Sequence, residues 1–96
     1  MTTTYDPTKS QAVVWTIPND YFCETAVRIL ILRGIPKDKV VEKSIERHKE
    51  EFDAACPNAK FVPQIFIDGT LIGGTSDLVN WFKERGIPDG VQTPTK

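Results

Sequence analysis

The clearest structural signal in this 96-residue chain is the stretch Val62-Pro63-Gln64-Ile65-Phe66-Ile67-Asp68-Gly69-Thr70-Leu71-Ile72-Gly73-Gly74. Two apolar runs, residues 63–67 and 70–73, flank an Asp-Gly pair, which is a favoured dipeptide in two-residue hairpin turns. A proline cannot donate a hydrogen bond to a neighbouring strand, so Pro63 fits at the first position of the first run. The stretch therefore predicts a β-hairpin.

Strand and helix patterns alternate before this hairpin. Residues 12–17 are apolar and rich in β-branched side chains, which predicts a buried strand. Asp20 is a good N-cap for the helix that follows, and Gly34 ends that helix. Residues 40–45 predict a second strand, and residues 46–55 predict a short surface helix.

A last helix follows the hairpin. Its predicted cap is Thr75 or Ser76, and Gly86 ends it. The order is thus strand, helix, strand, helix, hairpin, helix. Because a helix connects the first two strands, we expect them to be parallel and the sheet to be covered by helices. We predict a small α/β sandwich with a mixed four-stranded sheet that has parallel and antiparallel pairs.

The composition excludes several classes of protein. Twelve basic and 13 acidic side chains give a net charge of −1, which argues against a nucleic-acid-binding protein. The longest apolar runs are far too short to span a bilayer. Two cysteines are too few for a disulfide framework, and the first residues show no signal-peptide pattern. We expect a reduced, cytoplasmic protein that binds neither nucleic acid nor membranes.

One domain is expected between two flexible ends. Residues 1–11 are polar and contain a proline, which predicts a flexible N-terminal arm. Residues 88–96 have the same character and predict a flexible C-terminal tail. The domain itself covers residues 12–87.

Three places in the chain are candidates for chemistry. The first is the Val62-Pro63 pair, although an ordinary trans proline also fits the start of a strand. Gly73 and Gly74 lead into the last predicted helix, where free amides and the helix dipole favour an anion, although a glycine pair also fits an ordinary turn. Cys23 lies in the first turn of the first predicted helix, a setting that lowers a thiol pKa. It shares a helix face with Ala26 and Val27, so it is either a reactive thiol or a small buried apolar residue.

These places occur in an order that resembles the glutaredoxin family of the thioredoxin fold. The resemblance spans roughly residues 12–86 and is carried mainly by Val62-Pro63-Gln64-Ile65-Phe66-Ile67-Asp68-Gly69, Ile72-Gly73-Gly74 and Asp77-Leu78. It implies a thioredoxin-like fold, a cis bond before Pro63, and glutathione as co-substrate or ligand, with no tightly bound cofactor. By the same resemblance, the backbone of Val62, beside Pro63, would pair with the cysteinyl part of glutathione. Gly74, Ser76 and Asp77 would hold its γ-glutamyl end.

The sequence departs from the family where the reactive cysteine is expected. Members usually carry Cys-Pro-Tyr-Cys or Cys-Gly-Phe-Ser, and the corresponding residues here are Asp20-Tyr21-Phe22-Cys23. Asp20 therefore stands at the usual nucleophile position, and Cys23 stands where the second cysteine usually lies. Ile17 replaces a lysine that usually helps to bind glutathione, and Phe61 replaces a threonine.

A carboxylate at position 20 changes the chemistry of the nearby thiol. It accepts hydrogen bonds from amides that would otherwise stabilise a thiolate, and its charge raises the pKa of a thiol one turn away. The loss of the lysine acts in the same direction. We therefore expect Cys23 to carry little thiolate. Asp20 also has a purely structural explanation, because it caps a helix.

Two functions remain as hypotheses. The first is a glutathione-dependent redox protein that reduces protein or small-molecule disulfides through Cys23 alone. The second is a redox-inactive binding module that keeps a surface for glutathione or for a protein partner. Tyr21, Phe22 and Phe61 would form an aromatic docking patch on that surface, unless they pack against the Val-Pro pair instead.

The other candidate ligands have no assigned chemical role. Cys56 is expected to pack at the end of the short helix, and His48 is expected to lie in solvent. One histidine and two separated cysteines lack the spacing of a zinc site, so no metal is expected. An iron–sulfur cluster would need the thiol that Asp20 replaces.

Overall fold

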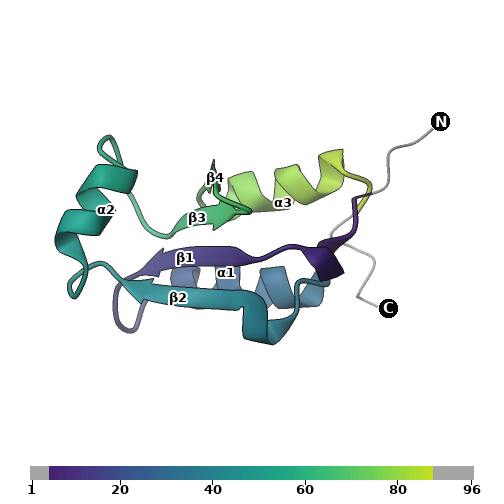
Figure 1. Ribbon diagram of the computed structural model, residues 1–96, viewed down its shortest axis with the longest axis horizontal. Coiled ribbons are helices and arrows are strands. Elements are labelled where there is room, and N and C mark those ends of the chain that lie inside the picture. Colours follow the sequence, from purple (N-terminus) through teal and green to yellow (C-terminus); the bar gives the residue numbers. More distant parts are fainter. Residues whose placement is uncertain (1–4, 88–96) are drawn as a thin grey trace.

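The computed structural model describes residues 5–87, which form an α/β sandwich around a four-stranded sheet (Figure 1). The elements in chain order are η1 (Pro7–Lys9), β1 (Ala12–Thr16), α1 (Tyr21–Leu32), η2 (Lys37–Lys39), β2 (Val40–Ser44), α2 (Lys49–Ala55), β3 (Gln64–Ile67), β4 (Thr70–Gly73) and α3 (Thr75–Glu84). The strand order is β2-β1-β3-β4, with β1 and β2 parallel and the other pairs antiparallel. The predicted α/β sandwich with a mixed sheet is confirmed. The predicted tail over residues 88–96 lies outside the described residues.

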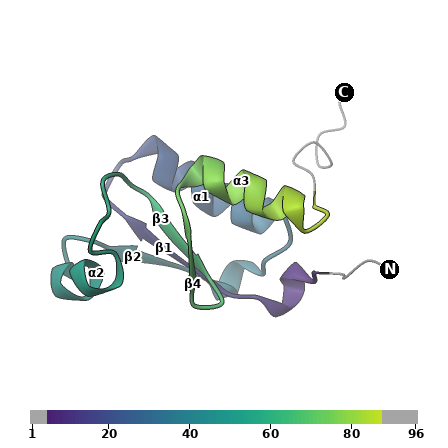
Figure 2. The same cartoon turned by 90° about the horizontal axis from the view of Figure 1, so that it is seen from above.

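Helices α1 and α3 lie side by side on one face of the sheet (Figure 2). The hydrophobic core fills the layer between them and the sheet and contains Ala12, Val14, Ala26, Leu30, Ile35, Ile65, Ile67, Leu78 and Phe82. Alternate residues of β1 and β3 enter this layer, as the period of two in a strand requires. On the other side, α2 covers only the end of the sheet, where Phe52 packs against Trp15 with ring centroids 5.4 Å apart.

The start of α2 differs from the prediction. The sequence predicts a helix from residue 46, whereas α2 begins at Lys49. The preceding residues form a turn in which the His48 amide donates to the Ser44 carbonyl at 3.1 Å. The Arg47 amide also donates to Ser44 Oγ at 3.2 Å. This serine therefore stabilises the turn, and the helix begins only after it.

The hairpin between β3 and β4 has the predicted turn. Asp68 and Gly69 have φ values of 52° and 84°, which are the left-handed conformations that this turn type requires. The Asp68 carboxylate also accepts hydrogen bonds from Ser10 Oγ at 2.8 Å and from the Gln11 amide at 3.1 Å. The turn is therefore tied to the segment that precedes β1.

Residues 5–11 lie against the domain, although the sequence predicts a flexible arm over residues 1–11. Tyr5 packs edge-on against Trp81 with ring centroids 5.1 Å apart. The Tyr5 hydroxyl donates to Ser10 Oγ at 2.7 Å, and Ser10 is buried. The contact between Tyr5 and Trp81 joins residues that are far apart in the sequence, so local composition does not indicate it.

Replacing Tyr5 by alanine should lower the free energy of unfolding by about 1–2 kcal/mol, because the change removes an aromatic contact and a hydrogen bond. Tyr21 is the matched control, since it is the same residue type and is 69% exposed. Tyr21→Ala should cost less than about 0.5 kcal/mol. Urea unfolding followed by circular dichroism measures both changes. Equal losses in the two variants would contradict the packing of residues 5–11.

Candidate functional site

The candidate site lies at the edge of the sheet where β1 ends and β3 begins. Trp15 of β1 pairs with Gln64 of β3, which brings the turn after β1 next to the loop before β3. The first turns of α1 and α3 meet at the same edge, where Thr75 Oγ1 donates to the Phe22 carbonyl at 3.3 Å. Segments that are distant in the sequence therefore form one continuous surface.

A cavity of about 480 Å³ opens at this edge. Its lining comprises Phe22, Phe61, Val62, Pro63, Gly74, Thr75, Ser76, Asp77 and Val79. The structure thus brings together all five residues that the resemblance implies for glutathione binding. Neither the sequence pattern nor the resemblance implied a binding role for Thr75 or Val79. Only the helical spacing between Ser76 and Val79 could have indicated that the latter shares a face with the site.

A buried glutamine holds the loop before β3. The bond between Val62 and Pro63 is cis, as the resemblance implies. Gln64 is 4% exposed, and its Nε2 donates to the Phe61 carbonyl at 2.8 Å. The main chain on both sides of Val62 is thereby fixed at the wall of the cavity. No sequence pattern indicated this role of Gln64.

The start of α3 borders the opposite side of the cavity. The sequence predicts Thr75 or Ser76 as the N-cap, but this prediction is wrong, because the cap is Gly74. Asp77 supplies the local contact, since its Oδ2 accepts a hydrogen bond from the Gly74 amide at 3.0 Å. The positive end of the helix dipole therefore lies beside the cavity, where it favours an anionic ligand group.

Asp20 caps α1 as predicted. Its Oδ2 accepts a hydrogen bond from the Cys23 amide at 3.0 Å, and its main chain has the extended conformation that is typical of an N-cap. The carboxylate therefore binds an amide of the first helical turn. In a protein with a cysteine at this position, the same amide would be available to a thiolate.

The Cys23 thiol is buried and resists ionisation. The residue is only 3% exposed, and burial is the main reason why its pKa is raised to about 11. A hydrogen bond from the Ile17 main chain lowers the pKa, while the Asp20 carboxylate raises it further. This direction agrees with the expectation that Cys23 carries little thiolate. Of the two alternatives for this residue, the structure favours the small buried apolar one.

Aromatic side chains surround the mouth of the site. Tyr21, Phe22 and Phe61 are 69%, 57% and 55% exposed, so they form a surface patch and are not packed away against the Val-Pro pair. The rings of Tyr21 and Phe22 contact each other edge-on, with centroids 5.5 Å apart. Ile17 is also exposed and adds no charge. The mouth is therefore apolar.

Cys56 has the packing role that was predicted for it. It is the C-cap residue of α2 and is 5% exposed, and its amide donates to the Phe52 carbonyl at 2.8 Å. Burial raises the pKa of its thiol. Across residues 5–87, no three or more His, Cys, Asp or Glu side chains are grouped to hold a metal ion. No helix in this range is long and apolar enough to cross a membrane.

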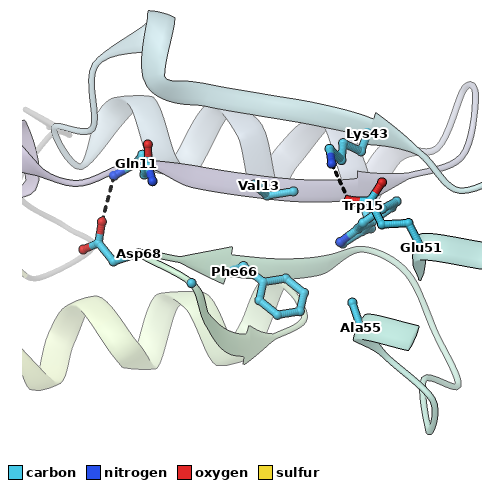
Figure 3. A pocket seen from close by; sticks show the side chains of 9 residues that line it. Gln11, Val13, Trp15, Lys43, Glu51, Ala55, Phe66 and Asp68 are labelled. Atoms are coloured by element: carbon cyan, nitrogen blue, oxygen red, sulfur yellow. Dashed lines mark hydrogen bonds and ion pairs between the residues drawn. The ribbon is translucent and has the colours of Figure 1, made fainter. Parts of the chain in front are cut away.

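A second cavity, of about 260 Å³, lies on the face of the sheet opposite α1 and α3 (Figure 3). Its floor is apolar and includes Val13 and Phe66. The charged groups at its two ends are already engaged. Lys43 pairs with Glu51, and Asp68 accepts from the Gln11 amide (Figure 3). None of the predicted site residues lines this cavity, and we assign no chemistry to it.

Comparisons with known proteins agree with this geometry. No protein-family model matches the sequence. The chain is 30% identical over 73 residues to Glutaredoxin 1 of Rickettsia prowazekii, an alignment that covers 75% of this chain and 77% of that protein. The solution structure of a dithiolic glutaredoxin from Trypanosoma brucei brucei aligns with a TM-score of 0.59 at 25% identity, over 91% of both chains. The crystal structure of Glutaredoxin 1 from Francisella tularensis, complexed with cacodylate, aligns with a TM-score of 0.60 at 22% identity, over 79% of this chain and 94% of that one. The fold is thioredoxin-like, as predicted.

Alkylation of Cys23 should be slow at neutral pH and should accelerate up to about pH 11. The reaction rate follows the thiolate fraction, which is about a thousandth at pH 8 for a pKa of about 11. The measurement is the pH–rate profile with iodoacetamide in the Cys56→Ser variant, in which Cys23 is the only cysteine that can be alkylated. Asp20→Asn keeps a capping side chain but removes the charge, and it should increase the rate at pH 8. A profile that reaches its plateau below pH 9 would contradict the raised pKa.

Proposed function

The chain belongs to the glutaredoxin family of redox proteins, and on this premise we propose that it binds glutathione beside α3, with thiol–disulfide exchange through Cys23 suppressed at neutral pH. The observation that carries this proposal is the position of Asp20. Its carboxylate holds the first-turn amide of α1 at the point where family members present a thiol. The protein then acts as a glutathione-binding module with a glutaredoxin fold, in a reducing, cytoplasmic setting.

The shape and the polarity of the cavity support glutathione as the ligand. A volume of about 480 Å³ lies within the usual range for small-molecule sites. One carboxylate of the γ-glutamyl group would lie at the positive end of α3, and its ammonium group would lie near Asp77. The main chain of Val62, fixed by the loop contacts, would pair with the cysteinyl part. Ser76 and Gly74 complete the wall next to the γ-glutamyl end.

Three features support suppression of the thiol chemistry. The sulfur of Cys23 is shielded, since the residue is 3% exposed. Its pKa of about 11 leaves almost no thiolate at neutral pH. Among the described residues that line the cavity, none is Lys, Arg or His, so no nearby cation favours a thiolate or a disulfide leaving group.

Exchange through Cys23 is the second candidate function, and family membership favours it. In this reaction the Cys23 thiolate attacks a glutathione mixed disulfide, releases the partner as a thiol after protonation, and becomes a Cys23–glutathione disulfide. A second glutathione thiolate then attacks this disulfide, which produces oxidised glutathione and restores Cys23. The start of α1 would have to move, because the sulfur must reach solvent before it can attack.

Asp20→Cys should create glutathione-dependent reductase activity at least tenfold above that of the wild type. The new thiol would occupy the N-cap, where the helix amides and the dipole stabilise a thiolate. The assay is the reduction of a small mixed disulfide by glutathione, coupled to glutathione reductase, with Cys23→Ser alongside. We expect the wild type and Cys23→Ser to be equally slow. Rapid wild-type turnover that disappears in Cys23→Ser would instead establish the second candidate function.

Asp77→Asn should weaken glutathione binding about five- to tenfold, which corresponds to about 1 kcal/mol. Asparagine can still accept the hydrogen bond of the Gly74 amide, so the change removes charge and leaves the helix start intact. Isothermal titration calorimetry gives the dissociation constants. Asp53→Asn is the control, since Asp53 lies on α2 in an exposed pair with Lys49. Equal affinity in the wild type and Asp77→Asn would argue against this position of the ligand.

A further inference from the structure

Phe61 has a fixed position at the mouth of the cavity. It precedes the Val-Pro pair, and its carbonyl accepts the 2.8 Å hydrogen bond from the buried side chain of Gln64. The residue is 55% exposed, so one side of its ring faces solvent. Its ring also lines the cavity. The backbone is thus anchored while the ring remains available to a ligand.

The inner side of the Phe61 ring lies directly on Gly74. A Cβ added to Gly74 would lie 2.8 Å from Cε1 of the ring, which is closer than real Cβ contacts. Gly74 has φ −93° and ψ −166°, a conformation open to any residue, so backbone strain does not require a glycine there. A side chain at position 74 would require the Phe61 ring to move. The ring therefore lies against the start of α3 on one side and faces solvent on the other.

Phe22 extends this apolar wall from the side of α1. Its carbonyl accepts the hydrogen bond from Thr75 Oγ1, which fixes the first turn of α1 against the first turn of α3. Phe22 and Phe61 line the same cavity, together with Val62, Pro63 and Val79. Asp77, at the α3 end, is the one charged side chain among the described residues that line it. The cavity is polar at one end and apolar at the other.

The apolar end is the end that the sulfur of bound glutathione would face. The family resemblance implies a reactive thiol at the position of Asp20, so under the proposed function the glutathione sulfur would point toward the start of α1. Asp20 is occupied as a helix cap, and Cys23 is buried behind it. A group attached to the glutathione sulfur would therefore meet aromatic rings and not a protein thiol.

From this arrangement we infer that Phe61 is a specificity-determining residue and that the site prefers glutathione carrying an apolar group on its sulfur over glutathione itself. The inference rests on the proposed function, because the γ-glutamyl end must bind beside α3. The apolar substituent would cover the exposed faces of Phe61 and Phe22 and remove them from water. The free sulfur of glutathione offers no such contact.

Calorimetric titration with glutathione and with S-hexylglutathione tests the inference. The wild type should bind S-hexylglutathione at least tenfold more tightly, which corresponds to about 1.4 kcal/mol. In Phe61→Thr this ratio should fall below about threefold, mainly because S-hexylglutathione binds more weakly. Phe61→Leu keeps an apolar side chain and should retain most of the preference. Leu32→Thr is the control, since Leu32, the last residue of α1, is a similarly exposed apolar residue that does not line the cavity. Thermal unfolding of each variant verifies that it is folded.

The outcomes separate this inference from the proposed function. If the wild type binds both ligands equally well, the preference for an apolar substituent is wrong and glutathione binding stands. If Phe61→Thr keeps the full ratio, Phe61 is not the determinant. If the folded wild type binds neither ligand, both the glutathione site and this inference are wrong.

Discussion

The arrangement of the site depends on strand β1, which pairs with a strand on each of its edges. Its parallel neighbour is β2, and its antiparallel neighbour is β3. Since Trp15 lies opposite Gln64, the chain that leaves β1 and the chain that enters β3 must run side by side. This pairing uses main-chain atoms only. The site edge is therefore assembled whichever side chain occupies position 20, so the fold does not depend on a cysteine there.

At the start of α1, a thiolate and a carboxylate compete for the same stabilising groups. The first turn of a helix offers unpaired amides and the positive end of a dipole, and both favour a negative charge. In this chain the Asp20 carboxylate accepts the hydrogen bond of the Cys23 amide. A helix cap of this kind contributes about 1 kcal/mol to stability. The same charge makes ionisation of the neighbouring thiol harder, so local stability and thiol reactivity are opposed here.

The features that the sequence predicted correctly are those that neighbouring residues determine. The hairpin turn follows from Asp68-Gly69, and the start of α1 follows from Asp20. The N-cap of α3 was predicted wrongly because Gly74, Thr75 and Ser76 are all acceptable caps that differ little in free energy. The hydrogen bond from the Gly74 amide to the Asp77 side chain favours Gly74 as the cap. The packing of Tyr5 and of Phe61 was missed for a different reason. Each depends on a partner that only the tertiary fold brings near.

The two walls of the site also differ in how far the sequence could predict them. The main chain of Val62 and the first turn of α3 are positioned by the sheet and by a helix dipole, so they are set by the fold and were implied by the family resemblance. The opposite wall consists of side chains, chiefly Phe22 and Phe61, and its character can change without any change in the fold. Under the proposed function, a binding half and a reacting half are therefore separable in this architecture. The Asp20 cap leaves no thiol at position 20 in one half, while the main chain of Val62 and the first turn of α3 remain available to a ligand in the other.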